Sequence, residues 1–407
     1  MSVLSYLEKL LNGVDIQWKT IGEVTLRTSN IKWREATRSY RYVDLTSVDI
    51  ETKKITETTE VTANNAPSRA QKLIEENDVI FATTRPTQQR FCLIDGEYSD
   101  EVASTGFCVL RAKQNEVLPK WIWHWISTSY FKKYVEENQS GSAYPAISDA
   151  KVKECYIPVP CPENPEKSLT IQAEIVRILD KFTALTAELT AELTMRKKQY
   201  NYYRDQLLCF DEAEVEWKAL ADVAILRRGR VMSKGYLEQN AGDYPVYSSQ
   251  TARNGMIGSI DTYDFDGEFI SWTTDGANAG TVFYRTGKFS ITNVCGLIKI
   301  HENYPISYKY LYYWLSIEAQ KHVYSGMGNP KLMSHQVEKI TVPIPFPASP
   351  EKSMLEQQRI VGILDKLEAI TFSLTEGLPR EIELRQKQYE YYRDLLFSFP
   401  RPETASN

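Results

Sequence analysis

Residues 157–182 read IPVPCPENPEKSLTIQAEIVRILDKF, and residues 342–367 read VPIPFPASPEKSMLEQQRIVGILDKL. The second stretch repeats the first at an offset of 185 positions, and more than half of the aligned residues are identical. A second pair follows, with RKKQYNYYRDQLL at 196–208 and RQKQYEYYRDLL at 385–396, now 189 positions apart. The chain therefore repeats itself, and the second copy has gained four residues between the two matched stretches.

Both repeats carry the apolar pattern of a long helix. Ile171, Ile175, Ile178 and Phe182 are separated by steps of four, three and four, which is the seam of a helix that packs on another helix. We expect the first helix to run from about residue 169 to 208 and the matching helix to follow in the second copy. Proline excludes the preceding stretches from the helix interior, so Ser168 and Ser353 are expected near the helix starts as caps.

The repeated helices differ in their middle sections. The first contains the tetrad Thr-Ala-Glu-Leu twice, at 186–189 and 190–193, whereas the second has three degenerate tetrads at 371–382. Gly377 and Pro379 are expected to weaken or kink the second helix. Two long helices with matching seams in one chain are expected to pack on each other.

A globular block precedes each helix, and the two blocks share scattered framework motifs. VIFATTRP at 79–86 parallels FISWTTDG at 269–276, and WIWHWIS at 121–127 parallels YLYYWLS at 310–316. Along the chain, a globular block, a Pro-rich hinge and a long helix therefore follow one another, and this order occurs twice. The expected divisions are 1–13 (a helical fragment that completes a circular repeat), 14–157 (first block), 158–210 (central helix), 211–345 (second block), 346–400 (C-terminal helix) and 401–407 (tail).

Composition excludes several classes of protein. The 407 residues carry 48 Lys+Arg and 53 Asp+Glu, so the net charge of −5 excludes a uniformly basic coat and leaves room for a local basic face. The six cysteines form no Cys-x-x-Cys pair and the four histidines have no i, i+4 spacing, so no metal site is expected. No signal peptide or membrane span is read, and we expect a protein of the reducing cytoplasm.

The sequence lacks common catalytic motifs. The chain contains no Gly-x-Ser-x-Gly, and Gly287-Lys288 lacks the earlier glycine of a phosphate-binding loop. The GANAG stretch at 276–280 is read as a turn. No catalytic residue is predicted. Two similar helices that carry two different globular blocks favour a protein that recognises two different targets, one with each block.

The repeated helix resembles the central conserved region of type I restriction-modification specificity subunits. The tandem TAEL tetrads are closest to the IC subfamily, and PVYSSQ at 245–250, WTTDGANAG at 272–280 and FSITNVCG at 289–296 resemble a target-recognition domain of that family. The resemblance covers nearly the whole chain. It implies an α+β fold, in which two pseudo-symmetric α/β target-recognition domains are joined by two long antiparallel coiled-coil helices.

The same resemblance implies a DNA-binding subunit without catalysis of its own. Each recognition domain would read one half of a bipartite site in double-stranded DNA, and the tetrads would set the gap between the halves. Two modification subunits would dock on the helices to form an adenine-N6 methyltransferase that uses S-adenosylmethionine. Two restriction subunits would add cleavage that requires ATP and Mg²⁺. This chain itself is expected to bind no cofactor.

Candidate DNA contacts are polar and basic side chains in Gly-, Pro- and Asn-containing loops. Arginine can pair with guanine and glutamine with adenine in the major groove, while phosphate contact is at least as common. For each of them a solvated loop or turn is the alternative interpretation. In the first block they are Arg34, Arg38, Arg41, Thr83, Thr84, Arg85, Gln88, Gln89, Arg90, Ser140, Ser142 and Tyr144. In the second block they are Arg227, Arg228, Arg230, Ser248, Ser249, Gln250, Arg253, Asn254, Thr273, Thr274, Asp275, Asn329 and Lys331.

The repeated QYxYYRD motif supplies candidate contacts to partner subunits or between the helices. These are Tyr200, Tyr202, Tyr203 and Arg204 in the first copy, and Tyr389, Tyr391, Tyr392 and Arg393 in the second. One rival hypothesis is a two-headed scaffold that binds proteins and reads no DNA. A single-chain restriction enzyme is a weaker rival, because its catalytic motifs are missing.

Overall fold

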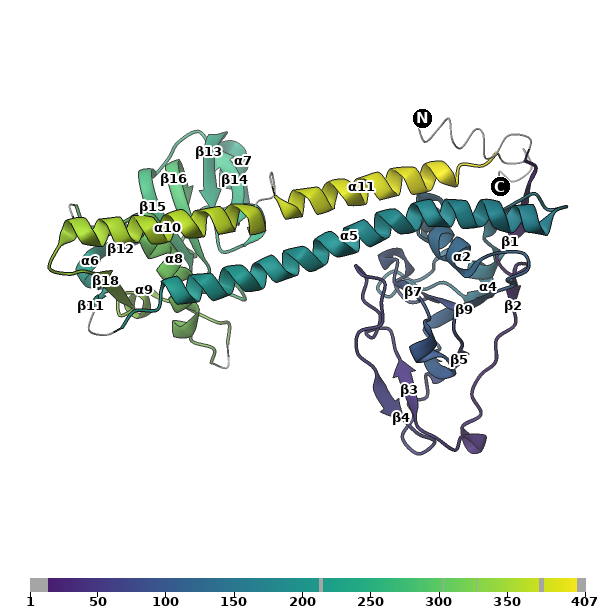
Figure 1. Ribbon diagram of the computed structural model, residues 1–407. Helices are drawn as coiled ribbons and strands as arrows, with labels where there is room; N and C mark the ends of the chain where they lie inside the picture. The colour runs from purple at the N-terminus through teal and green to yellow at the C-terminus, as the bar shows by residue number, and fades with distance from the viewer. Residues whose placement is uncertain (1–13, 212–214, 303, 327, 373–376, 401–407) are drawn as a thin grey trace. The chain divides into compact units, whose positions relative to one another are not determined.

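The computed structural model describes residues 14–211, 215–302, 304–326, 328–372 and 377–400 (Figure 1). The chain forms two compact units, one of residues up to Glu192 together with those from Arg380 onward, the other of Leu193–Pro379. The expected fragment 1–13 and tail 401–407 lie outside the described residues. The long helix α5 (Pro165–Leu207) contributes its first part to the first unit and its last turns to the second.

Among the described residues, the first unit contains three small sheets. The strands β1 (Ile16–Thr20) and β10 (Tyr156–Pro160) form an antiparallel pair. One four-stranded sheet has the order β2 (Thr25–Leu26), β9 (Phe107–Ala112), β6 (Val79–Ala82) and β7 (Phe91–Leu93). The other has the order β4 (Thr59–Val61), β3 (Tyr40–Val43), β8 (Glu101–Ser104) and β5 (Ala70–Ile74). The α-helices of this domain are α2 (Pro119–Ile126), α3 (Ser129–Asn138) and α4 (Asp149–Glu154).

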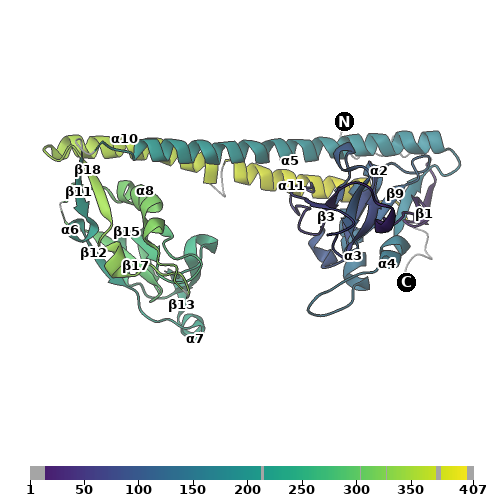
Figure 2. The same cartoon turned by 90° about the horizontal axis from the view of Figure 1, so that it is seen from below.

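The aromatic helix α2 joins this domain to the long helices. Trp121 and Trp125 are buried in one core with Ile175 and Leu179 of α5 and with Leu396 of α11 (Leu378–Leu396). Burial of such large apolar side chains stabilises the junction by several kcal/mol, at roughly 1.5–3 kcal/mol for each side chain. Within this unit α5 and α11 lie side by side and run antiparallel (Figures 1 and 2).

The second unit repeats this plan with a more continuous sheet. Its six strands have the order β12 (Ala224–Arg228), β17 (Cys295–Ile300), β15 (Phe265–Thr273), β16 (Val282–Ile291), β13 (Ala241–Tyr247) and β14 (Met256–Ile260). A further antiparallel pair joins β11 (Val215–Ala219) to β18 (Thr341–Pro345). The α-helices are α6 (Leu220–Val223), α7 (Lys234–Gln239), α8 (Tyr308–Glu318) and α9 (Ser334–Val337). Helix α8 lies between the sheet and α10 (Pro350–Phe372) (Figure 2).

Strand pairing shows that the two domains are copies. Trp18 pairs with Pro158 in the first antiparallel ribbon, and Trp217 pairs with Pro343 in the second. Each tryptophan ring also lies against a tryptophan of the aromatic helix, with centroids 5.6 Å apart in the first unit and 5.5 Å apart in the second. The expected fold of two alike α/β domains with long antiparallel helices is confirmed.

Helix α5 begins earlier than predicted. Its first residue is Pro165, whose missing N–H is no loss at the first helical position, and Asn164 Oδ1 accepts the backbone N–H of Lys167 at 3.0 Å. The assignment of Ser168 and Ser353 as caps was wrong, because both side chains are buried inside their helices. Each hydroxyl instead accepts a hydrogen bond from a glutamine one turn later, over 3.1 Å in both helices.

The second long helix is divided, as its glycine and proline predicted. The structure describes α10 up to Phe372 and α11 from Leu378 onward. Gly377 has φ +81°, and a Cβ there would lie 2.8 Å from the carbonyl oxygen of Ile370. Only glycine fits this conformation and this close approach.

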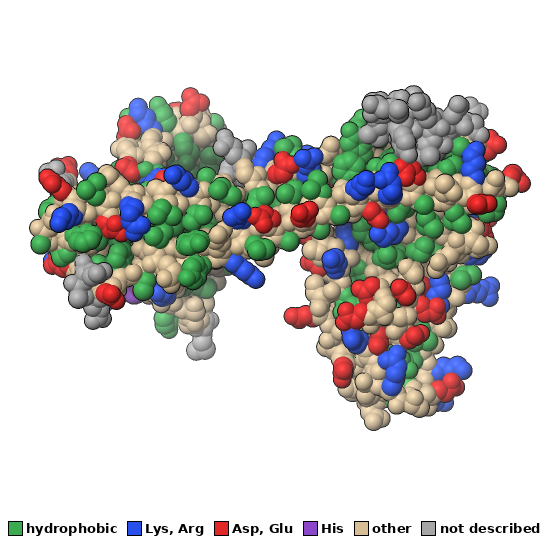
Figure 3. Space-filling view, viewed as in Figure 1, with side chains coloured by type: hydrophobic (Ala, Val, Ile, Leu, Met, Phe, Trp, Pro, Cys, Tyr) green, Lys and Arg blue, Asp and Glu red, His purple; other side chains and the backbone are tan. Residues whose placement is uncertain are grey.

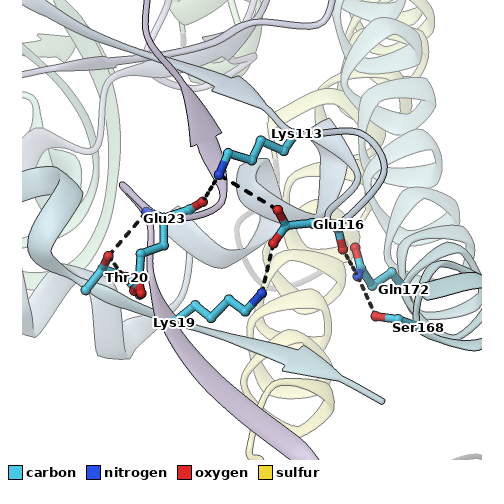
Figure 4. Close-up of polar contacts among 7 residues, drawn as sticks. All are labelled: Lys19, Thr20, Glu23, Lys113, Glu116, Ser168 and Gln172. Atoms are coloured by element: carbon cyan, nitrogen blue, oxygen red, sulfur yellow. Dashed lines mark hydrogen bonds and ion pairs between the residues drawn. The ribbon is translucent and has the colours of Figure 1, made fainter. Parts of the chain in front are cut away.

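A buried glutamine connects each domain to its long helix. Gln172 Nε2 donates to the carbonyl of Glu116 at 2.9 Å (Figure 4). Its Oε1 accepts the backbone N–H of Leu118 at 2.9 Å. The Glu116 carboxylate in turn binds Lys19 at 2.9 Å, so strand β1 joins the same network (Figure 4). In the second unit Gln357 accepts the N–H of Ser307 at 2.8 Å and donates to the carbonyl of Pro305 at 2.9 Å.

Candidate nucleic-acid interface

The end of strand β6 in the first domain is joined to a short closed loop. Ile147 N–H donates to the carbonyl of Thr83 at 2.9 Å, and Arg85 N–H donates to the carbonyl of Pro145 at 2.7 Å. Ser140 and Ala146 close the loop with two backbone hydrogen bonds of 2.8 Å. We call residues 83–85 and 140–146 the first loop cluster.

The second domain builds the same arrangement at the end of β15. Leu332 N–H donates to the carbonyl of Thr274 at 2.9 Å, and Gly276 N–H donates to the carbonyl of Pro330 at 3.0 Å. Tyr324 and Lys331 close the loop with bonds of 2.9 and 3.0 Å. We call residues 274–276 and 324–331 the second loop cluster, of which Met327 lies outside the described residues.

These bonds correct the sequence alignment of the two strand ends. The motif match had placed Thr83 opposite Thr273, but the hydrogen bonds make Thr83 equivalent to Thr274. Arg85 is then equivalent to Gly276, and Ala146 to Lys331. The sequence alignment was displaced by one residue, because both strands are followed by a Thr-Thr pair and aligning these pairs gave the wrong register.

Two predicted residues meet in the first loop cluster. The Arg85 guanidinium lies over the ring of Tyr144, 5.3 Å from its centroid, and Tyr144 is 72% exposed. Arg85 is itself exposed and has a left-handed backbone with φ 49°. An exposed guanidinium stacked on an exposed ring presents both a hydrogen-bonding fork and a flat apolar face.

The second loop cluster presents a different set of charges. Asp275 lies between Arg228, at 3.9 Å, and Lys331, at 4.0 Å. Its carboxylate also accepts a hydrogen bond from the Thr274 hydroxyl at 2.6 Å. Asp275 was proposed as a DNA contact together with Thr273 and Thr274 of the same WTTDG motif. A carboxylate flanked by two cations can accept from a cytosine amino group while the cations face phosphate.

Beside the second loop cluster lies a loop, 248–255, that carries five more predicted residues. Ser248 Oγ accepts from the Thr292 hydroxyl at 2.9 Å, and the Ser249 carbonyl accepts from Asn278 Nδ2 at 3.3 Å. Gln250 is tied back to the carbonyl of Met256 at 2.5 Å. Arg253 and Asn254 are exposed and have left-handed backbones, with φ 50° and 53°. The loop therefore has an anchored base and an exposed turn that carries Arg253 and Asn254.

Several predicted residues have structural partners within their own domain. Thr83 is buried and its hydroxyl donates to the carbonyl of Gly106 at 2.9 Å. Arg90 donates to the carbonyl of Leu45 at 2.6 Å, and the buried Thr273 hydroxyl donates to the carbonyl of Asn278. These three side chains fix loops and are directed inward.

Three further arginines proposed as DNA contacts form ion pairs within their own domains. Arg38 lies 3.2 Å from Glu101, Arg41 lies 2.6 Å from Glu97, and Arg230 lies 3.0 Å from Asp264. Arg34 lies on a short 3₁₀ turn and Arg41 on strand β3, so their spacing in sequence does not place them on one helix face. The hydrogen bond that Arg41 donates to the Glu97 carboxylate raises the pKa of Arg41, which remains a cation.

The remaining predicted residues vary in exposure. Gln89 has left-handed φ 53°, and both atoms of its amide are buried with no hydrogen-bond partner among the described residues. Thr84 is half-buried and pairs with Ala146 through a β-bridge. The exposed ones are Arg34, Gln88, Ser140, Ser142, Arg227 and Asn329.

The repeated tyrosine motif divides into buried and exposed members. Tyr200 and Tyr389 are buried, Tyr200 against Phe372 and Tyr389 in the core around Trp121. Tyr202 and Tyr391 occupy equivalent positions and are 62% and 61% exposed. Tyr203 is 43% exposed, whereas Tyr392 stacks on Phe182 with centroids 5.4 Å apart. Arg204 and Arg393 form ion pairs with Asp205 and Asp394 at 2.8 and 2.9 Å.

The face of the described residues shown in Figure 3 carries charges of both signs. Acidic and basic side chains are interspersed on this face, also along the long helices. No cluster of three or more His, Cys, Asp or Glu that could hold a metal ion occurs among the described residues. None of the helices in the described ranges is long and apolar enough to span a membrane.

The equivalent strands β9 and β17 each carry one cysteine, Cys108 and Cys295. Cys108 and Cys295 are buried, and burial raises the pKa of their thiols to about 12 and about 11. A thiol with so high a pKa is protonated at neutral pH and behaves as a small apolar side chain.

Comparison with known proteins identifies relatives over the whole chain. A family model described as Type I restriction modification DNA specificity domain matches residues 15–195 and again residues 212–384. The specificity subunit of the type I restriction enzyme EcoR124I/EcoR124II of Escherichia coli is 39% identical over 435 aligned positions, which cover 100% of both chains. The EcoprrI specificity subunit, also from E. coli, is 32% identical over 92% of this chain and 93% of its own length.

Solved structures share the fold. A chain from a structure of type I R-M complex assembly and conformational transition superposes with a TM-score of 0.59 at 21% identity, covering 94% of this chain and 97% of its own. The S subunit of a type I restriction-modification system from M. genitalium gives a TM-score of 0.56 at 16% identity, with 96% and 98% covered. The two family matches coincide with the two copies in the fold, and the chain belongs to the family of type I restriction-modification DNA specificity proteins.

Proposed function

We propose that each recognition domain of this specificity subunit reads one half of a bipartite site in double-stranded DNA. The first loop cluster, with Arg85 and Tyr144, would contact one half-site. The second loop cluster, with Asp275 and Lys331, and the 248–255 loop would contact the other. Lys and Arg side chains outside the loop clusters would bind phosphate, which sets register without reading sequence.

One observation carries this proposal. The backbone hydrogen bonds of the two loop clusters are equivalent, yet the side chains that the clusters present differ. Arg85 of the first domain occupies the position of Gly276 in the second, and Ala146 occupies the position of Lys331. Two domains that recognise different DNA sequences need a shared backbone framework with different exposed side chains. A protein-binding scaffold has no such requirement for polar, forked side chains at both loop ends.

The long helices would set the gap between the half-sites and dock two modification subunits. The equivalent exposed tyrosines Tyr202 and Tyr391 support two like docking places, since each is more than 60% exposed. The modification subunits would use S-adenosylmethionine to methylate adenine, and two restriction subunits would use ATP and Mg²⁺. This chain would bind none of these cofactors and would work in the cytoplasm.

The test is to co-express the chain with its modification subunit in a host without DNA methylation and to map methylated adenines across the genome. We expect one bipartite motif with a fixed gap, and no methylation by either chain alone. Methylation by this chain alone would overturn its role as a non-catalytic subunit. No methylation by a complex that assembles and binds its cofactor would favour the two-headed protein scaffold.

A further inference from the structure

Arg285 is a buried arginine at a place where the first domain has a buried isoleucine. It lies on strand β16, is 5% exposed, and pairs across the β15–β16 hairpin with Phe269. The hairpins are equivalent in length, because Phe81 pairs with Phe91 in the first domain and Trp272 with Val282 in the second. Counting three residues onward from each partner places Ile94 at the position of Arg285, and Ile94 is 1% exposed. The shared framework therefore does not require a charge here.

The contacts of Arg285 are aromatic and polar. Its guanidinium lies 3.6 Å from the ring centroid of Tyr247 and 4.5 Å from that of Phe283. Its Nε donates to the Ser271 hydroxyl at 3.0 Å. No carboxylate forms an ion pair with it among the described residues, and burial lowers its pKa to about 10. The guanidinium thus remains charged at neutral pH, held by two rings and a hydroxyl, at a cost in desolvation.

The 248–255 loop closes directly over this guanidinium. Ser248 N–H donates to the carbonyl of Gly255 at 2.8 Å, which brings the two ends of the loop together. Gly255 has φ +85°, and a Cβ there would lie 3.2 Å from Arg285 Nη2. The same Cβ would lie 3.1 Å from the carbonyl oxygen of Gln250 and 3.2 Å from that of Ser248. The edge of the guanidinium and two loop carbonyls therefore converge at one glycine.

We propose that Arg285 is a positioning residue that fixes the conformation of the 248–255 loop and so sets the base preference of the second recognition domain. Arg285 contacts the buried side of the loop through Tyr247 and the loop carbonyls. The loop so fixed presents Arg253 and Asn254 on its exposed side. The planar guanidinium matters because it stacks on Tyr247 while its edge stays directed at the loop. This inference rests on the proposed DNA-reading function and concerns one half-site only.

The test compares Arg285→Ile, Arg285→Lys and wild type, each co-expressed with the modification subunit, by mapping methylated adenines. Arg285→Ile installs the residue of the first domain, and Arg285→Lys keeps the charge without the planar group. Lys288→Ala is the matched control, because Lys288 is an exposed cation on the same strand. Thermal unfolding of each complex checks that the second domain is folded.

We expect both Arg285 variants to methylate an unchanged first half-site while the second becomes degenerate at one or more positions. Loss of one well-read base pair corresponds to about a tenfold fall in discrimination at that position. An unchanged second half-site in a folded Arg285→Ile complex overturns the inference, and full rescue by lysine overturns the role of the planar group. Should Arg285→Ile fail to fold, Tyr247→Leu tests the same stack from the loop side, with the same outcomes. If wild type itself methylates no DNA, the proposed function fails instead.

Discussion

His124 Nε2 lies 3.0 Å from Asp180 Oδ1, which joins the aromatic helix of the first domain to the long helix α5. The other ring nitrogen, Nδ1, lies 3.0 Å from the hydroxyl of Tyr389 on α11. One buried imidazole therefore links a domain to both long helices. The second unit has Tyr313 at the equivalent place, and its hydroxyl donates to Asp365 at 2.6 Å. The two junctions share geometry, but the first has a histidine where the second has a tyrosine.

We predict that the first junction weakens on mild acidification. Burial lowers the pKa of His124 below the ordinary 6.5 of imidazole, so the unfolded chain binds a proton that the folded chain does not. Its stabilising contribution is complete above pH 6.5 and is progressively lost as the pH falls below 6.5. Hydrogen bonds from His124 and Lys120 outweigh burial and lower the pKa of Asp180 below 3.8, so Asp180 does not titrate in this range. Thermal unfolding of His124→Gln should show a flatter pH dependence between pH 7.5 and 5.5, while Tyr313→Phe should leave the slope unchanged.

The buried glutamines support a second prediction. Gln357→Leu leaves the N–H of Ser307 and the carbonyl of Pro305 without their partner, which should destabilise the second junction by about 3 kcal/mol. Gln358→Leu is the control, because Gln358 is the next residue and is exposed. Denaturant unfolding measures both variants. Equal midpoints for the two would show that the buried amide contributes nothing.

Much of the fold could be predicted because repetition in the sequence repeats the core. The apolar steps from Ile175 to Phe182 recur after 185 residues, and both copies formed helices whose seams pack as expected. Gly377 also predicted the division of the second helix correctly. The helix starts were wrong by four residues, because the sequence Pro-Glu-Lys-Ser reads equally well as a hinge or as a first turn.

The candidate site was harder to predict, because contacts between distant residues decide which side chains remain available. Arg38 and Arg41 were proposed as DNA contacts, but Glu101 and Glu97 lie about 60 positions further on and pair with them. Arg85 and Tyr144 were both proposed, yet their stacking depends on a bridge between Thr84 and Ala146. Arg285 was missed, since a lone arginine in a strand gives no signal until its burial is known.

The loop clusters predict separable effects on the two half-sites. Arg85→Ala removes an exposed fork and its stack on Tyr144, and should weaken binding to the first half-site about tenfold to a hundredfold. Lys331→Ala should affect the second half-site alone. Binding of the assembled complex to duplexes mutated in either half measures this, and each variant serves as the control for the other. Effects of one variant on both half-sites would contradict the assignment of one domain to each.

The exposed tyrosines predict where partner subunits bind. Tyr391→Ala should weaken association with the modification subunit and leave thermal stability unchanged, because its side chain is 61% exposed. Tyr389→Phe should do the reverse, since it removes the buried bond to His124 and costs about 1 kcal/mol of stability. Analytical ultracentrifugation and thermal unfolding separate the two effects. Normal assembly of a complex carrying both Tyr391→Ala and Tyr202→Ala would exclude this surface as the docking place.

The tandem tetrads of α5 predict that the length of this helix sets the distance between the two half-sites in DNA. Thr186 donates its hydroxyl to the carbonyl of Phe182 at 2.9 Å, and Thr190 donates to that of Thr186 at 2.8 Å. Each tetrad therefore bonds to the turn before it in the same way, and Thr190 and Ala191 are exposed, so another tetrad should be accommodated. An added Thr-Ala-Glu-Leu after Leu193 lengthens the helix by about 6 Å and turns it about 40° beyond a full turn.

Along duplex DNA about 6 Å corresponds to one or two base pairs, so the gap between the half-sites should widen by that amount. Both half-sites should stay the same, because the loop clusters lie outside the inserted turn. A four-residue insertion containing Gly-Pro is the control, since it adds the same length of chain but breaks the helix and should abolish methylation at any fixed gap. Mapped methylation with altered half-sites, or with an unchanged gap, would refute the idea that the helix measures the distance.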